Sequence, residues 1–248
     1  TGWNNVKYQK RTPELAVPEA QKSVPKSTPW GDMTYLEYKY RVEFEKPEYD
    51  IIDAYCKDKG MTWSASPWDM PSLEFLLQYD VPYIKIASAS NGRDEMIAEA
   101  AKSGKPVILS TGMTTMDEID HAVEVLEKNG HGDYILMHTN SAYPAPVKDL
   151  NMRMIQTLKD RFDCLVGYSG HEENLEPTIA AVVLGACCIE RHVTLSHDMW
   201  GSDQKASLEV HAMEMLNKRI QNVYDSLGTG IKYMSESEAV QRKKLRTV

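Results

Sequence analysis

The feature that most constrains the fold is the regular alternation of short apolar runs with helix-like segments from Pro47 onwards. Seven runs with strand character begin near residues 6, 61, 83, 106, 134, 165 and 187. After the first gap they follow one another at intervals of about 20–30 residues, the length of one strand–helix unit. Strongly apolar strands that alternate with helices are typical of a parallel sheet covered by helices on its outer face. We therefore predict an α/β fold.

Helical spacing, caps and closing glycines place the helices between these strands. The expected helices are 49–59, 73–79, 95–102, 116–128, 152–162, 176–184 and 208–227, with a further one possible over 35–44. Residues 10–50 otherwise lack a clear period and are rich in Pro, Ser and Thr. A connection of this length usually forms a lid or a wall of a binding site.

Two α/β architectures fit this alternation. A doubly wound sheet is possible, but no GxGxxG sequence follows any of the strands, which disfavours a dinucleotide-binding fold. A (β/α)8 TIM barrel needs eight strands, and the sequence shows seven. The first run begins at residue 6, so the missing first βα unit would precede Thr1. We predict this barrel, with its first βα unit absent.

Composition narrows the range of partners and compartments. The chain has 248 residues, of which 42% are hydrophobic and 26% charged, which is enough apolar material for a full core. A net charge of −8 argues against nucleic acid as a partner. No apolar window is long enough to span a membrane, and residues 1–20 lack a signal-peptide pattern. The cysteines, Cys56, Cys164, Cys187 and Cys188, are interpreted as reduced core residues, so a cytoplasmic location is expected.

Polar residues gather at the carboxyl ends of the predicted strands, where the active sites of such folds lie. They are Lys7 and Gln9, Ser64 and Ser66, Lys85 and Ser88, Ser110 and Thr111, His138 to Ser141, Ser169 and His171, and Glu190 and His192. A single serine at a strand end more often caps the next helix than binds a ligand. A set drawn from every strand indicates a site.

Two lysines are placed inside predicted strands. Lys85 lies between Ile84 and Ile86, so its side chain points to the face opposite theirs. If the isoleucines pack against the helices, Lys85 points into the barrel, and Lys7 has the same arrangement. Burying an ammonium group without a partner is costly. Two inward lysines among hydroxyl groups therefore favour a phosphate or carboxylate ligand.

His171 and His192 follow two consecutive strands and are 21 residues apart. Strands joined by one helix in a parallel sheet lie side by side with the same ends together. The two histidines are thus expected to meet and could share a metal ion. Taken singly, His171 is equally explained as a helix cap or surface residue, and His192 as a satisfied buried histidine. The spacing is not a compact HExxH or CxxC signal and leaves these alternatives open.

The chain also resembles the sialic acid synthase family, the phosphoenolpyruvate-dependent nonulosonic acid synthases. The motifs that carry the resemblance are VKYQK (6–10), WG-x-x-TY-x-x-YK (30–39), YIKIASAS (83–90), GKPVILSTGM (104–113), HTNSAYPAP (138–146), VGYSGHE (166–172), VLGACCIERHVTL (183–195) and GSDQKASLE (201–209). The resemblance implies a transferase that condenses phosphoenolpyruvate with an N-acetylated sugar aldehyde such as N-acetylmannosamine. The product would be a nine-carbon 2-keto acid, with release of phosphate.

The resemblance also assigns roles to residues. A divalent ion, Mn²⁺ or alternatively Mg²⁺, would be held by His171 and His192. Phosphoenolpyruvate would be bound by Lys7 and Lys85 and by the hydroxyls of Ser66, Ser88, Ser110 and Ser169, and the sugar by Gln9, Tyr143 and Asp203. Ser141 completes the substrate-binding candidates, and the catalytic candidates are His171, His192, Lys85 and Asp203. The ion would polarise the aldehyde oxygen, and the lysines would neutralise the phosphate and carboxylate.

The sequence departs from the family pattern at three places. Ser90 stands where the family often has an acidic residue, and Gln204 stands where it usually has histidine. The family's first βα unit and its small C-terminal antifreeze-like domain, which reaches across a homodimer, are absent. We expect residues 1–232 to form the synthase domain and residues 233–248 to be a linker towards that second domain.

Two alternatives to the synthase are considered. One is a related keto-deoxy acid synthase that uses phosphoenolpyruvate and a sugar phosphate. The other is a catalytically inactive barrel that binds an anionic metabolite, an interpretation suggested by Ser90 and the missing segments. Phosphate release with different aldoses distinguishes all three.

Overall fold

The computed structural model describes residues 2–247, and it contains all seven predicted strands. They are β1 (Asn5–Lys10), β4 (Thr62–Pro67), β5 (Ile84–Ile86), β6 (Val107–Ser110), β7 (Tyr134–Thr139), β8 (Leu165–Gly170) and β9 (Ile189–Arg191). Every pairing between these strands is parallel. The α/β prediction is confirmed.

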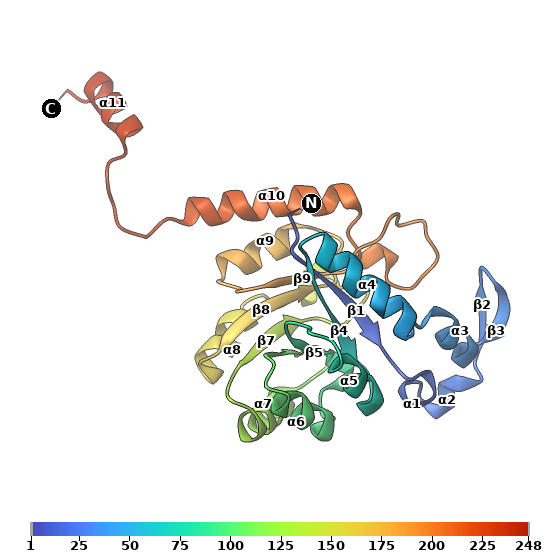
Figure 1. The fold of residues 1–248 in the computed structure, drawn as a ribbon. Helices are drawn as coiled ribbons and strands as arrows, with labels where there is room; N and C mark the ends of the chain where they lie inside the picture. The colour runs from blue at the N-terminus through green and yellow to red at the C-terminus, as the bar shows by residue number, and fades with distance from the viewer. Residues whose placement is uncertain (1, 248) are drawn as a thin grey trace.

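The strands curve into a half-barrel (Figure 1). Strands β5 to β9 form one five-stranded sheet in chain order, and β1 pairs with β4 in a second sheet. The two sheets meet between β4 and β5, where the Ser64 hydroxyl donates to the Tyr83 carbonyl at 2.7 Å. On the other side, β1 faces β9, and side chains rather than a backbone ladder link the two strands.

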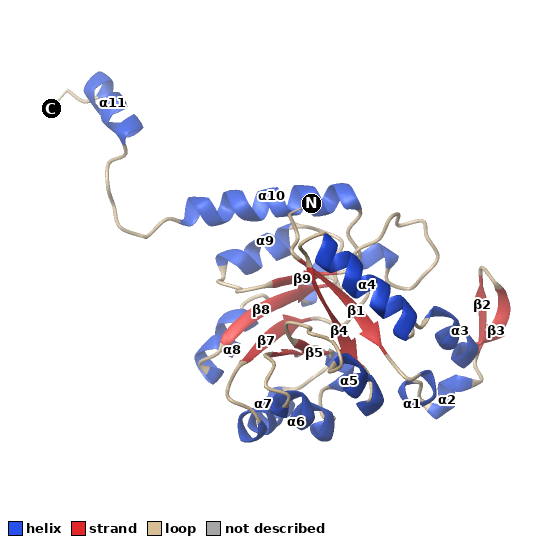
Figure 2. Cartoon of the chain, in the orientation of Figure 1, coloured by secondary structure: helices blue, strands red, loops and turns tan. Residues whose placement is uncertain are grey.

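Helices cover the outer face of the strands, as Figure 2 shows. They are α4 (Lys46–Asp58), α5 (Met70–Leu76), α6 (Asp94–Lys102), α7 (Met116–Asn129), α8 (Met154–Phe162), α9 (Glu176–Val183) and α10 (Val210–Leu227). Helices α4 and α5 each begin three residues earlier than expected. Helix α4 starts at Lys46 because Glu45 and Glu48 form a capping box, and α5 starts at Met70 because Asp69 accepts a hydrogen bond from the Ser72 amide.

The main core lies between the strands and this helical layer. Ile84 and Ile86 are fully buried there with Leu109 of β6. Helices α6 and α7 contribute Ile97 and Val123 to the same cluster and pack side by side. Because these apolar strand residues face outwards, their neighbours in each strand face the interior of the half-barrel.

The long segment after β1 is more structured than its composition predicts. It contains α1 (Pro13–Ala16), α2 (Glu19–Lys22), the antiparallel hairpin of β2 (Pro25–Thr28) and β3 (Gly31–Thr34), and α3 (Tyr35–Val42). The hairpin was not predicted, because its strands are short and contain Pro, Gly and polar residues, which are rare in strands.

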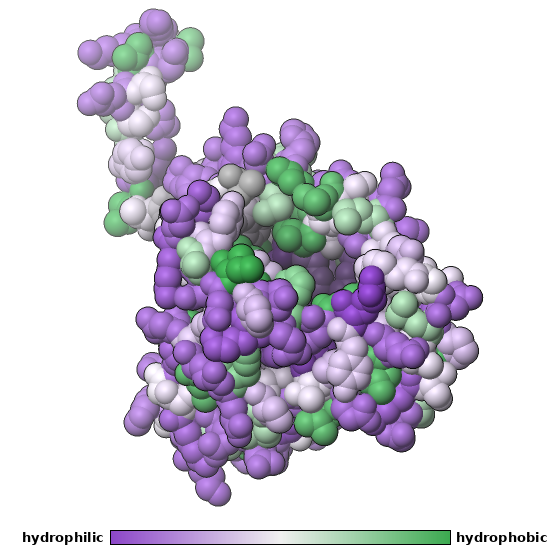
Figure 3. Space-filling model, turned by 45° about the vertical axis from the view of Figure 1, so that its right-hand side comes forward, coloured by the Kyte–Doolittle hydropathy of each residue, from purple (hydrophilic) through white to green (hydrophobic). Residues whose placement is uncertain are grey.

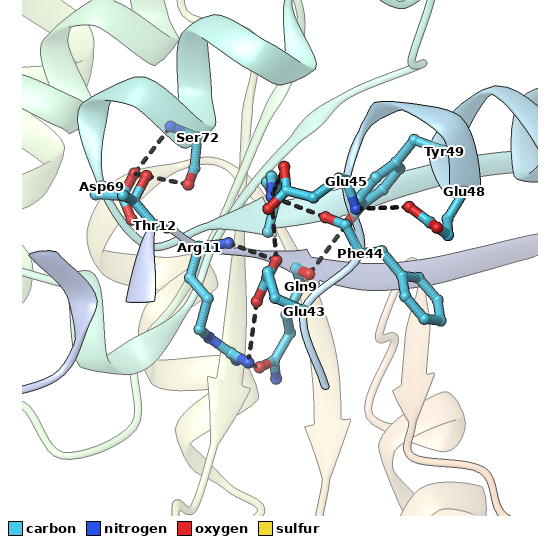
Figure 4. Close-up of polar contacts among 11 residues, drawn as sticks. Gln9, Arg11, Thr12, Glu43, Phe44, Glu45, Glu48, Tyr49, Asp69 and Ser72 are labelled. Atoms are coloured by element: carbon cyan, nitrogen blue, oxygen red, sulfur yellow. Dashed lines mark hydrogen bonds and ion pairs between the residues drawn. The ribbon is translucent and has the colours of Figure 1, made fainter. Parts of the chain in front are cut away.

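Both ends of this segment are tied to the strands, as Figure 4 shows. At its start, the Arg11 amide donates to Glu43 at 3.0 Å, and Thr12 donates to the carboxylate of Asp69. At its end, Lys10 donates to the Phe44 carbonyl at 2.8 Å. The anchored segment therefore begins and ends beside the carboxyl end of β1.

The C-terminal part contains a helix where a linker was expected. Helix α11 (Glu236–Leu245) begins at the capping box of Ser235 and Glu238, buries no residue, and extends away from the rest of the chain in Figure 1. Across residues 2–247, no helix is long and apolar enough to cross a membrane.

The cysteines are all free, as predicted, but they are not all core residues. Cys56 is buried, Cys164 and Cys188 are partly buried, and Cys187 is exposed. The core interpretation was wrong for Cys187, because it lies in the connection before β9 and not within the strand.

Candidate functional site

Three charged side chains meet inside the half-barrel at the carboxyl ends of its strands. Lys85 of β5 is 2% exposed and donates to the Ser110 hydroxyl at 2.6 Å. Glu190 of β9 lies 3.5 Å from the Lys7 ammonium and 3.9 Å from that of Lys85. Lys85 therefore points inwards, as its position between two isoleucines predicted, and the two lysines share one carboxylate.

Burial and these charges shift the pKa values of the group. Burial lowers the pKa of Lys85 to about 8, although Glu190 opposes the shift. Burial alone would raise the pKa of Glu190, but Lys85, Lys7 and His192 outweigh it and hold that pKa at about 2. Glu190 is therefore a carboxylate at neutral pH with two cations beside it. With both lysines protonated, the centre carries a net positive charge that suits an anionic ligand.

The predicted hydroxyls fall into two groups. Those of Ser110 and Ser169 contact the charged centre, since Ser110 accepts from Lys85 and Ser169 donates to Glu190 at 3.4 Å. Ser88 and Ser141 instead flank Gly112. A Cβ atom at position 112 would lie 2.8 Å from the Ser88 hydroxyl and 2.2 Å from that of Ser141. The absence of a side chain at Gly112 thus lets both hydroxyl groups pack against its backbone, where the Gly112 amide donates to the Ser88 hydroxyl at 3.0 Å.

Some buried polar atoms near these strand ends lack a protein partner. The hydroxyls of Ser66 and Ser90 and both polar side-chain atoms of Asn91 are buried without hydrogen bonds among the described residues. Buried polar groups are normally satisfied by protein, water or ligand. The Ser66 hydroxyl is therefore available to a ligand. Ser90, where the sequence departs from the family pattern, is fully buried and keeps an unpaired hydroxyl.

The two histidines meet, as their spacing predicted. Strands β8 and β9 pair with Gly170 opposite Arg191, so His171 and His192 stand one step beyond that pair. Their ring centroids are 5.1 Å apart at an angle of 83°. Tyr143 stacks on the His171 ring at 4.2 Å and lies 5.5 Å from the His192 ring.

Each histidine has an oxygen acceptor beside one ring nitrogen. His171 Nδ1 lies 2.5 Å from the Asn140 carbonyl oxygen, and His192 Nδ1 lies 3.5 Å from an Asp203 oxygen. Burial lowers the pKa of His171 to about 4, so its imidazole is neutral at pH 7. The hydrogen bond from His192 is the main cause that lowers the pKa of Asp203 to about 2.

This arrangement fits a pair of metal-binding imidazoles. A histidine that donates Nδ1–H to an oxygen presents the Nε2 lone pair to a metal, and outer partners of this kind orient such ligands. His171 Nε2 lies 3.1 Å from the Tyr143 hydroxyl. Within residues 2–247, no group of three or more His, Cys, Asp or Glu side chains is placed to hold an ion by itself. Further ligands would have to come from substrate or water.

The predicted sugar-binding residues lie on one side of the same site. Gln9 accepts a hydrogen bond from Arg11, and Asp203 precedes the short 3₁₀ turn Gln204–Ala206. The loop before that turn contacts the long segment after β1. Trp200 packs edge-to-face on Trp30 at 5.9 Å and on Tyr38 at 5.2 Å. These contacts join two segments that are far apart in sequence.

A cavity of about 600 Å³ lies between β1 and β9. Its lining includes Lys7, Gln9, Glu190, His192 and Asp203. On the side of the molecule that carries β2 and β3, the space-filling view shows a hollow rimmed by polar and apolar residues (Figure 3).

Not every polar strand-end residue belongs to this site. Ser64 donates to the Tyr83 carbonyl, Thr111 to the Met137 carbonyl, and His138 contacts the Leu150 carbonyl, so these three serve the fold. In contrast, Glu190, which the sequence placed among the polar strand-end residues without a specific role, contacts both lysines. Alternation already put it on the same face of its strand as His192, but could not show its contact with the lysines.

Comparisons with known proteins agree with this geometry. The model of the NeuB family matches residues 1–232. The N-acetylneuraminate-9-phosphate synthase of Drosophila melanogaster is 40% identical over 194 residues, which are 78% of this chain. That match spans 52% of the Drosophila protein, so the chain corresponds to about half of it.

Two further relatives match nearly the whole chain. The N,N'-diacetyllegionaminic acid synthase of Campylobacter jejuni is 34% identical over 242 residues, covering 96% of this chain and 72% of its own length. The crystal structure of N-acetylneuraminic acid synthetase from Leptospira borgpetersenii in complex with citrate superposes with a TM-score of 0.84 at 30% identity. The superposition covers 99% of this chain and 82% of the Leptospira one.

Proposed function

The chain belongs to the NeuB family, and we propose that it condenses phosphoenolpyruvate with an N-acetylated sugar aldehyde to give a nine-carbon 2-keto acid and phosphate. The observation that carries the proposal is a centre of two lysines and one glutamate beside a pair of histidines. The first suits an anionic enol donor, and the second suits a metal ion that activates an aldehyde.

Phosphoenolpyruvate would bind at the lysines. Lys7 and Lys85 supply point charges for its phosphate and carboxylate, and Glu190 stabilises the charged form of Lys85 before the ligand arrives. The hydroxyls of Ser66, Ser88, Ser110, Ser141 and Ser169 would supply further hydrogen bonds. Support comes from the unpaired Ser66 hydroxyl and from the Ser88 and Ser141 hydroxyls, which converge on Gly112.

A divalent ion, Mn²⁺ or Mg²⁺, is proposed at His171 and His192. When bound, it supplies a Lewis acid for the aldehyde oxygen of the sugar. Asn140 and Asp203 favour the tautomer of each imidazole in which Nε2 carries no proton, and in His171 this nitrogen lies 3.1 Å from the Tyr143 hydroxyl. Burial, with Asp203 and Glu190, raises the pKa of Tyr143 to about 12, so this residue stays protonated and can donate a hydrogen bond to the sugar.

The bond changes are those of an aldol-like condensation. C3 of phosphoenolpyruvate attacks the aldehyde carbon and forms the new carbon–carbon bond. Water adds at C2, the C–O bond to phosphate breaks, and phosphate leaves with both electrons of that bond. Because Lys85 is buried, solvent screens its charge little where it would face the departing phosphate.

The proposed acceptor class is N-acetylated hexosamine, with N-acetylmannosamine as the reference compound. The relatives are named as a 9-phosphate synthase and as a diacetyllegionaminic acid synthase, so members of the family differ in product. Gln9, Tyr143 and Asp203 are the proposed sugar contacts. A sugar phosphate acceptor is the second candidate, and the same assay separates the two.

The proposal extends to architecture. An eighth strand between β9 and β1 would complete a (β/α)8 barrel, supported by the cavity that these two strands flank. We propose a synthase domain over residues 1–232, with residues 233–248 leading to a second domain, in a cytoplasmic homodimer of the full-length protein.

Phosphate release tests the reaction. Full-length protein with Mn²⁺ and phosphoenolpyruvate is expected to release phosphate only when an N-acetylated hexosamine is present. Release with arabinose 5-phosphate, and none with acetylated sugars, would support the sugar phosphate synthase. Phosphoenolpyruvate binding with no release for any aldose would support an inactive barrel. His192→Ala is expected to abolish both Mn²⁺ binding and turnover, and survival of either contradicts the histidine site.

A further inference from the structure

The two histidine-bearing motifs carry a second set of contacts on the side of the strands opposite the site. In VGYSGHE, Ser169 contacts Glu190 inside the half-barrel, whereas Tyr168 and Glu172 meet on the other side. In IERH, the neighbours of Arg191 face the site and Arg191 faces away from it. The proposed function uses the inward residues and leaves Glu172 and Arg191 without a role.

Glu172 and Arg191 form a fully buried ion pair. Their side chains are 0% and 1% exposed, and Arg191 Nη1 lies 3.2 Å from Glu172 Oε1. The carboxylate also accepts from the Tyr168 hydroxyl at 2.8 Å and from the Thr178 hydroxyl of α9 at 2.9 Å. Arg191 donates to the Thr178 hydroxyl at 2.9 Å. Removing two charges from water costs free energy, so a buried ion pair is weak evidence of stabilisation alone. The additional hydrogen bonds of this pair therefore point to a structural role for it.

The pair extends the link between β8 and β9 beyond their backbone ladder. That ladder ends at Gly170 opposite Arg191, so no backbone bond holds the chain at His171 to the chain at His192. Arg191 Nη2 donates to the main-chain carbonyl oxygen of Glu172 itself, and Nη1 donates to that of Asn174. The Arg191 guanidinium thus binds the backbone that follows His171. Because Arg191 directly precedes His192 in the sequence, these bonds link the two histidine-bearing segments.

Gly170 is the residue that makes room for this pair. A Cβ atom at position 170 would lie 2.6 and 2.8 Å from the two carboxylate oxygens of Glu172 and 2.8 Å from the Tyr168 ring. Any side chain would push the carboxylate away from Arg191. The spacing Gly-His-Glu is therefore explained sterically, because the glycine accommodates the glutamate that follows the histidine.

We propose that the Glu172–Arg191 pair is a positioning device that sets the separation and direction of the His171 and His192 imidazoles. Neither residue touches the site. Each is bonded in sequence to one of the histidines, and together they link the two backbone segments beyond the last paired residues of β8 and β9. The inference rests on the proposed metal site for its function, but the positioning of the two rings is independent of any ion.

Two substitutions perturb the pair in different ways. Glu172→Gln keeps the shape and removes the charge, whereas Gly170→Ala keeps both charges and displaces the carboxylate. Asp69→Asn is the matched control, because Asp69 is also a buried carboxylate with several hydrogen bonds, at Thr12 and Ser72 away from the histidines. All three variants are expected to lower the melting temperature of the full-length protein.

The first measurement uses metal-free protein with selectively labelled histidine. The imidazole resonances of His171 and His192 are expected to move in Glu172→Gln and in Gly170→Ala and to stay in place in Asp69→Asn. Unmoved resonances in both pair variants would overturn the positioning role, whatever happens to stability. If Glu172→Gln fails to fold, Gly170→Ala decides the question, since it keeps both charged groups of the pair.

The second measurement is a titration with Mn²⁺ followed by electron paramagnetic resonance. The dissociation constant is expected to rise by about tenfold or more in both pair variants, the effect usual for lost outer-shell orientation, and to be unchanged in Asp69→Asn. Equal affinity in all proteins would reduce the pair to a stability element and contradict the proposal. Absence of Mn²⁺ binding in the wild-type protein would instead refute the metal site, and the imidazole resonances would still decide the pair.

Discussion

Lys85 and Glu190 face each other across the interior of the half-barrel, with Nζ 3.9 Å from Oε2. Burial lowers the pKa of the lysine to about 8, and the glutamate prevents it from falling further. This relationship means that the charge of the proposed phosphoenolpyruvate site changes close to physiological pH.

Phosphoenolpyruvate binding is expected to weaken as the pH rises through about 8. Lys85 is cationic below its pKa and neutral above it, and only the cation attracts the phosphate and carboxylate. In calorimetric titrations between about pH 7.5 and about pH 9.5, the dissociation constant is expected to increase by up to tenfold for each pH step of one. Lys85→Arg, which does not titrate in this range, is the control and should flatten the profile. A flat wild-type profile would contradict this role of Lys85.

Glu190→Gln is expected to move that profile towards lower pH. Without the carboxylate, the cationic form of Lys85 loses its stabilising partner, so affinity begins to fall at a lower pH than in the wild type. At still lower pH the variant should bind phosphoenolpyruvate more tightly than the wild type, because a negative charge beside the anion is gone. The two curves therefore cross, and parallel curves would show that Glu190 does not set the charge of Lys85.

Gly112→Ala is expected to reduce phosphoenolpyruvate affinity by about tenfold or more while leaving the protein folded. The added methyl group would clash with the Ser88 and Ser141 hydroxyls and displace them from the proposed ligand site. Calorimetry measures the affinity, and thermal melting with Mn²⁺ titration shows whether the damage is local. Unchanged affinity would place the ligand elsewhere.

Trp200→Ala is expected to raise the KM for the sugar with little change in phosphoenolpyruvate affinity. Trp200 contacts Trp30 and Tyr38, and the Lys26 ammonium lies 5.4 Å from its ring. An aromatic pair and a cation–π contact are each worth about 1 kcal/mol, so the two together correspond to roughly a thirtyfold effect. Steady-state kinetics test this, with Trp200→Phe as the conservative control. An equal loss of affinity for both substrates would argue against a role confined to the sugar side.

Much of the fold follows from local pattern. Ile84, Lys85 and Ile86 alternate, and that alternation alone placed the lysine inside the half-barrel. The helical period and the glycines after it located α6 to α9 within two residues at their starts. The β2–β3 hairpin escaped prediction because Pro, Gly and polar residues give no strand signal, and it is held by its contacts with the rest of the chain.

The candidate functional site likewise has features that the sequence predicted and features that only the tertiary structure shows. The spacing of the two motifs predicted that His171 and His192 stand at the ends of neighbouring strands, because strands joined by one helix in a parallel sheet usually lie side by side with the same ends together. Tertiary structure alone decided that Glu190 contacts both lysines, that Ser88 and Ser141 meet at Gly112, and that Glu172 finds Arg191. Those pairs join different strands, and their contact depends on register and side-chain reach across the sheet, which no periodicity along a single strand encodes.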